Sequence, residues 1–117
     1  MRMVDRIFGW LMVAAALLHS YGAWTAYHSQ HELLLWSLAA GLAEFYLAGM
    51  NLIRAERRHD LSLARLCVAG NLTWLIVVIC FAGLVGHFFE PKVLIQFVIT
   101  CALLGLSMRA RNRSRPM

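Results

Sequence analysis

The sequence predicts an all-α integral membrane protein: an antiparallel bundle of four transmembrane helices with both termini on the cytoplasmic side. Hydrophobic residues make up 61% of the chain and charged residues 15%, whereas soluble domains carry roughly 45–50% and 25%. Four apolar segments each approach the ~20 residues that a helix needs to cross a bilayer. The basic residues lie almost entirely on one side of these segments, and this bias predicts the orientation.

Each apolar segment is interpreted as one spanning helix of a single membrane domain. The four segments cover residues 7–27, 33–53, 63–86 and 93–108. Continuous apolar runs lack the alternation of barrel strands. The first run follows two arginines, as in a signal peptide, but it is long enough to span a bilayer and is interpreted as a retained helix. Because the breaks between segments are short, consecutive helices are expected to run antiparallel as neighbours.

Every basic residue except Lys92 falls on the side predicted to be cytoplasmic. The residues on that side are Arg2, Arg6, Arg54, Arg57, Arg58, Arg65, Arg109, Arg111, Arg113 and Arg115. This bias explains the net charge of +5 without a nucleic-acid partner. We expect the basic tail, residues 109–117, to lie against anionic lipid headgroups or to act only as a topology anchor. The short breaks and the bias favour a bacterial inner membrane.

Two ionisable residues fall deep within the predicted helices. Such residues are costly in lipid and usually face the interior of a bundle. His19 lies in the first segment and Glu44 in the second, and their depths differ by about one helical turn. Because these helices are predicted neighbours, a hydrogen bond or ion pair between the two side chains is feasible.

Each predicted helix also carries polar or small residues on one face. In the second helix this face, at spacings of three and four, comprises Ser37, Gly41, Glu44, Ala48 and Asn51. In the first helix the face comprises Ala15, His19, Gly22 and Ala26. The third helix carries Asn71, and one face of the fourth carries Gln96, Thr100 and Ser107. The predicted intramembrane polar site therefore consists of His19, Glu44, Asn51, Asn71, Gln96 and Thr100.

The polar site has two interpretations. Interhelical hydrogen bonds, each worth on the order of 1 kcal/mol, could simply hold the bundle together. Alternatively, the residues form a proton or substrate site in which Glu44 titrates and His19 is its partner.

Histidines and acidic residues of the first and third breaks form a second candidate site at the outer side. Its members are His28, His31, Glu32, His87 and Glu90. Imidazole and carboxylate groups suit zinc, copper or nickel, so a metal ion could bind there; the alternative is a solvated loop. The three cysteines form no paired motif and are interpreted as packing residues. No other cofactor is predicted.

The function hypotheses follow from these polar residues, because no nucleotide-binding loop or hydrolase motif is present. A non-enzymatic role is therefore favoured. The first hypothesis is a proton-linked transporter or carrier component, with Glu44 as proton carrier and with His19, Asn71 and Gln96 lining the path. The alternatives are a non-catalytic accessory subunit of a larger membrane complex and a metal- or haem-binding membrane subunit. Because so short a chain encloses little cavity, a homo-oligomer or a larger complex is expected.

Overall fold

The computed structural model describes residues 2–86 and 90–114. These residues form four helices: α1 (Arg2–Tyr27), α2 (His31–Glu56), α3 (Leu61–Val85) and α4 (Pro91–Arg113). All four are long and apolar enough to cross a membrane. The predicted all-helical class with four membrane-spanning segments is therefore confirmed at the level of helix number, length and composition.

Each helix begins before the apolar segment from which it was predicted, and α2 and α4 also end beyond theirs, because polar residues continue the backbone hydrogen bonding at these ends. α4 continues to Arg113, so the first basic residues of the predicted tail are helical. The start of α3 is capped by Asp60, whose side chain accepts a hydrogen bond from the Leu63 amide at 2.9 Å. Gly86, at a φ of 79°, ends α3 in the left-handed conformation that favours glycine.

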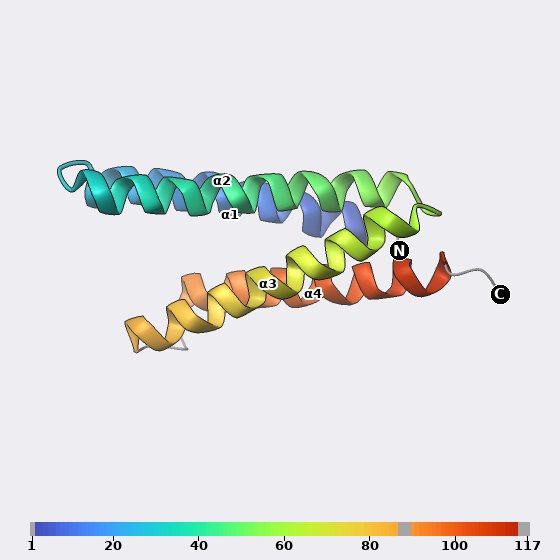
Figure 1. Cartoon of the computed structure of the whole chain (residues 1–117). Helices are drawn as coiled ribbons and strands as arrows, with labels where there is room; N and C mark the ends of the chain where they lie inside the picture. The colour runs from blue at the N-terminus through green and yellow to red at the C-terminus, as the bar shows by residue number, and fades with distance from the viewer. Residues whose placement is uncertain (1, 87–89, 115–117) are drawn as a thin grey trace.

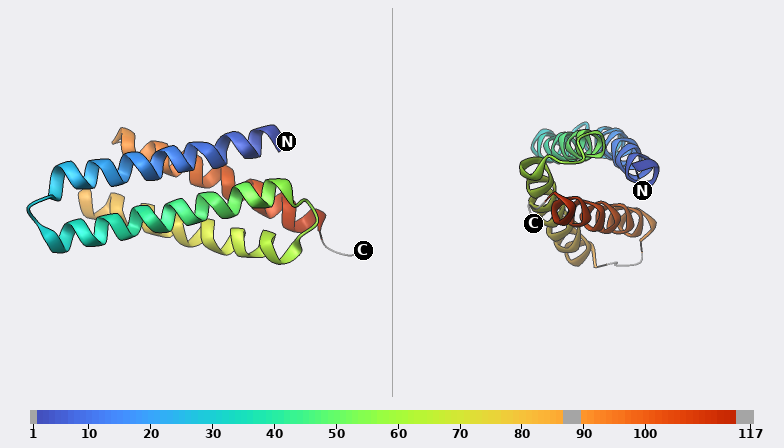
Figure 2. Two further views of the ribbon diagram at one scale, coloured as in Figure 1. Left: turned by 90° about the horizontal axis from the view of Figure 1, so that it is seen from above. Right: turned by 90° about the vertical axis from the view of Figure 1, so that its right-hand side faces the viewer.

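The helices form two antiparallel hairpins, α1–α2 and α3–α4 (Figure 1). The hairpins are closest at the end that holds both termini and the α2–α3 connection, which we call the terminal end. There the Ser114 hydroxyl donates to the Arg58 carbonyl oxygen at 3.1 Å. Towards the opposite end, which we call the far end, the ribbons of the two hairpins diverge (Figures 1 and 2).

The main apolar core joins three helices. Its fully and nearly fully buried members are Met12, Leu47, Ala48, Ile99 and Leu103. α1 and α2 also approach closely at Gly41, where a Cβ atom would collide with the Ser20 side chain. The core therefore lies along the inner face of α2, the same face that carries the buried polar residues Glu44, Asn51 and Arg54.

The predicted inward face is correct for α2 and displaced for α1. Gly41, Glu44, Ala48 and Asn51 are all buried, as their spacing predicted, and Ser37, the first residue of the predicted face, is half-buried. On α1 the buried residues are Asp5, Gly9, Met12, Ala16 and Ala23, one position away from the predicted stripe. Since one residue turns a helix by about 100°, His19 and Ala26 of that stripe are exposed instead.

Candidate functional site

Seven polar side chains are buried among the described residues, and five of them form one hydrogen-bonded network. These five, called the polar network below, are Asp5, Asn51, Arg54, Asn71 and Ser107. They come from α1, α2, α3 and α4. The polar network therefore joins both hairpins, close to the terminal end.

The strongest link in the network is an ion pair between α2 and α1. The Arg54 guanidinium donates two hydrogen bonds to the Asp5 carboxylate, at 2.7 and 2.6 Å. Arg54 is only 2% exposed, and such two-point arginine–carboxylate pairs are the strong ones. The predicted second segment ended at residue 53, with Arg54 just outside it. This boundary is wrong, because Arg54 lies inside α2, where Asp5 balances its charge.

Two amides and a hydroxyl extend the network to α3 and α4. Asn51 and Asn71 exchange hydrogen bonds through their side-chain amides, at 3.0 and 2.9 Å. Arg54 also donates to the Asn51 Oδ1 atom at 3.1 Å, and Asn71 donates to the Ser107 hydroxyl at 2.9 Å. The Ser107 hydroxyl in turn donates to the Leu103 carbonyl oxygen at 2.7 Å. Buried polar groups bonded in this way rigidify a core.

Glu44 is buried on the same face of α2 but does not belong to the network. It lies near the midpoint of the helix and is 0% exposed. Among the described residues, neither carboxyl oxygen has a hydrogen-bond partner. The Gln96 side chain on α4 is a polar neighbour of the Glu44 carboxyl, without the geometry of a hydrogen bond. Thr100, also fully buried, donates its hydroxyl to the Gln96 carbonyl oxygen of its own helix at 2.6 Å.

The structure does not bring His19 and Glu44 together. His19 is exposed, and its Nε2 atom lies 3.0 Å from the backbone carbonyl oxygen of Ser37. The reason is the displaced face of α1, which turns His19 away from the bundle interior. Of the six predicted polar-site residues, Asn51 and Asn71 are bonded to each other, and Gln96 is a neighbour of Glu44.

The candidate metal ligands at the far end do not form a cluster in the part of the chain that the structure describes. His28, His31 and Glu32 are exposed, and Glu90 is half-buried. The His28 Nδ1 atom lies 3.4 Å from the Thr25 carbonyl oxygen. Residues 2–86 and 90–114 contain no group of three His, Cys, Asp or Glu side chains arranged to hold a metal ion. His87, the fifth candidate, lies outside the described residues.

Sequence reasoning missed the ion pair, although two signals for it are present. Asp5 lies seven positions before Met12 and four before Gly9, so it shares the packed face of α1. Arg54 follows Asn51 by three positions and therefore continues the polar face of α2. Arg54 was counted only among the basic residues that set the orientation, and Asp5 was not considered.

Comparison with protein-family models, with curated proteins and with solved structures finds no match to this chain. The functional argument therefore rests on the polar groups themselves. The side chains of the polar network are hydrogen-bonded to one another, as structural polar groups usually are. In contrast, neither carboxyl oxygen of Glu44 has a hydrogen-bond partner among the described residues. A carboxyl group of this kind can bind a proton or a cation.

Proposed function

We propose that this protein is a proton-linked membrane carrier or carrier component, with Glu44 as its proton-binding group. The observation that carries the proposal is the complete burial of the Glu44 carboxyl at the middle of a spanning helix, with no partner among the described residues. A charged, unpaired carboxylate is strongly disfavoured in such surroundings. Glu44 therefore holds a proton while the bundle is closed, and it releases the proton when water reaches it.

Comparison with the polar network supports this assignment, because its buried side chains are hydrogen-bonded across helices, as expected of groups with a structural role. Asn51 lies seven positions from Glu44 on the same face of α2 and is hydrogen-bonded to Asn71 of α3 and to Ser107 of α4. Glu44 has the same burial without such bonds. Gln96, a polar neighbour of Glu44 on α4, would line the path along which the proton leaves. His19 has no direct role at Glu44 in this arrangement, since it contacts Ser37.

We further propose that both termini face the cytoplasm, in a bacterial inner membrane. Supporting this orientation, the exposed arginines of α1, the α2–α3 connection and the end of α4 gather at the terminal end, while Lys92 lies at the far end. The arginines at the end of α4 would then lie against anionic headgroups. A single bundle of this size encloses little space for a transport path. Assembly with further copies of the chain, or with a larger complex, would enclose such a path.

Charge movement after a pH step tests the proposal without knowledge of the transported compound. Proteoliposomes are adsorbed on a solid-supported membrane, and the transient current is recorded for the wild type, Glu44→Gln and Glu32→Gln. Glu32 is the matched control, because it is an exposed carboxyl in the first turn of the same helix. The wild type and Glu32→Gln should give a transient that Glu44→Gln lacks.

An unchanged transient in Glu44→Gln would contradict the proposal. A wild type with no transient, combined with altered assembly or stability of Glu44→Gln, would instead support the accessory-subunit hypothesis. The same samples therefore distinguish a carrier from an accessory subunit.

A further inference from the structure

A second cluster of charged side chains lies outside the polar network, on the outer surface at the terminal end. Arg2 and Arg6 of α1 both contact the carboxylate of Glu56 at the end of α2, the latter at 3.3 Å. All three side chains remain about half exposed. Asp5, the acidic residue between the two arginines, is already paired with Arg54. Two guanidinium groups and one carboxylate therefore leave one positive charge unbalanced.

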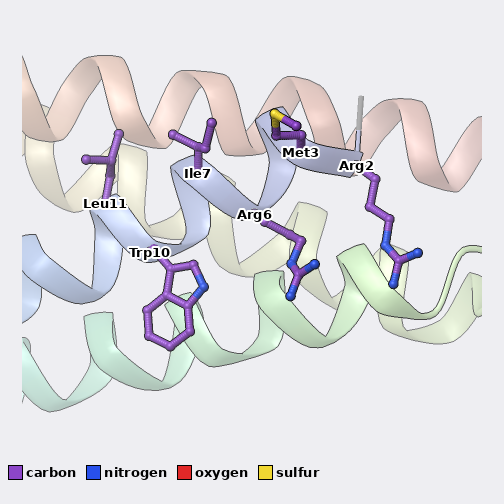
Figure 3. Close-up of a pocket in the computed structure, with 6 residues that line it drawn as sticks. All are labelled: Arg2, Met3, Arg6, Ile7, Trp10 and Leu11. Atoms are coloured by element: carbon purple, nitrogen blue, oxygen red, sulfur yellow. The ribbon is translucent and has the colours of Figure 1, made fainter.

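The two arginines of this cluster form one end of an open surface pocket of about 680 Å³ on α1 (Figure 3). The pocket is lined by Arg2, Met3, Arg6, Ile7, Trp10 and Leu11. These residues form two rows, each at a spacing of four, on one face of the helix. In Figure 3 Arg2, Arg6 and Trp10 lean towards α2, whereas Met3, Ile7 and Leu11 point to the other side of α1, towards α4.

The polarity of the pocket changes along the helix axis. Its arginines lie at the end of α1, and its apolar residues continue as far as Leu11. From Arg6 to Leu11 the helix rises about 7.5 Å along its axis, so the apolar residues follow directly after the arginines and cover about half of one leaflet of a ~30 Å hydrocarbon core. The pocket therefore presents positive charge at the depth of one headgroup layer and apolar surface along the matching leaflet.

We propose that this pocket binds one phospholipid with a singly charged anionic headgroup. The phosphate is held by Arg2 and Arg6, and an acyl chain lies along Ile7, Trp10 and Leu11. Each guanidinium carries five N–H donors, so contact with Glu56 leaves donors for phosphate oxygens. One phosphodiester also balances the single unpaired positive charge. Glu44 is not among the residues that line the pocket, so the test of this site is independent of the proposed transport function.

Tryptophan quenching by brominated lipids tests the site, because Trp10 lies in the pocket and is exposed. A chain that retains only Trp10 is made by the substitutions Trp24→Phe, Trp36→Phe and Trp74→Phe. It is reconstituted in phosphatidylcholine vesicles with increasing brominated phosphatidylglycerol or, in parallel, brominated phosphatidylcholine. Half-maximal quenching should need about a five-fold lower mole fraction of the anionic lipid, as expected for one net charge at a membrane surface.

Two matched controls separate a specific site from general attraction. A chain that retains only Trp24, which is exposed near the far end, should be quenched equally by both lipids. In the Trp10-only chain, Arg2→Gln with Arg6→Gln should abolish the five-fold preference. The pair Arg109→Gln with Arg113→Gln removes the same charge at the same end, from exposed positions outside the pocket, and should preserve it.

Equal quenching of Trp10 by the two lipids would overturn the proposal. Equal loss of the preference for anionic lipid in the two double-arginine variants would also overturn it, because it would show only general attraction to a charged surface. Displacement of the lipid effect by excess inorganic phosphate would show a free-anion site instead. Native mass spectrometry of the unsubstituted chain from mixed micelles gives a readout without tryptophan substitutions, and retention of one phosphatidylglycerol in preference to phosphatidylcholine is the expected result.

Discussion

Asn51 and Glu44 lie seven residues apart on one face of α2, and both are completely buried, yet their surroundings differ. Asn51 exchanges hydrogen bonds with α3 and accepts one from a paired arginine. Glu44 has none among the described residues. Equal burial therefore does not mean an equal role. We therefore propose that Asn51 holds helices together and that Glu44, which lacks such bonds, serves the proposed proton binding.

The largest expected effect is at the ion pair of the polar network. Arg54→Met leaves the Asp5 carboxylate buried without its partner and should lower the free energy of unfolding by about 3–5 kcal/mol. Arg57→Met is the control, because Arg57 is exposed only three positions further on. Unfolding of both variants by a denaturing detergent in bicelles measures the difference. If the two variants lose similar free energy of unfolding, the ion pair does not stabilise the bundle.

Substitution of Glu44 should raise the free energy of unfolding, whereas substitution of Arg54 should lower it. Glu44→Leu removes a carboxyl group for which the described residues supply no hydrogen bond, and it should raise the free energy of unfolding by about 1–3 kcal/mol. The same unfolding assay applies, with Glu32→Leu as the exposed control. A loss comparable to that of Arg54→Met would mean that Glu44 is a structural group after all.

The smallest effect is expected at the α4 edge of the network. Ser107→Ala removes one hydroxyl that links α4 to Asn71 and should cost about 1 kcal/mol. Thr73→Val is its control, because the Thr73 hydroxyl is exposed and donates only to the Ala69 carbonyl oxygen of its own helix, at 2.8 Å. If the two variants are equally stable, the hydrogen bond from Asn71 to Ser107 contributes little to helix association.

The sequence was sufficient for the helices and for the inner face of α2. The helices follow from apolar length, and the face follows from the spacing of Gly41, Glu44, Ala48 and Asn51. The inner face of α1 was misplaced by one residue, because a lipid-facing surface is as apolar as a core. Residues such as Leu17 and Leu18 are exposed and give no contrast in polarity to mark the packed side.

The pairing of Arg54 with Asp5 also could not be predicted from spacing alone. The two residues are 49 positions apart, and their contact depends on how α1 rotates against α2. The same rotation decides that His19 contacts Ser37 and not Glu44. The position of a residue in its apolar segment predicts how far along the bundle its side chain lies. It does not predict the direction in which the side chain points around the helix.

The state of the Glu44 carboxyl is the central claim, and infrared spectroscopy of the protein in lipid bilayers tests it most directly. The difference spectrum between the wild type and Glu44→Gln should contain the carbonyl band of one protonated carboxylic acid, at the high frequency of an acid without a hydrogen bond. The Glu32→Gln difference spectrum should lack this band. A Glu44 that gives carboxylate bands instead, or an acid band at the low frequency of a strongly hydrogen-bonded group, would contradict the assignment of Glu44 as an unpaired proton-binding group.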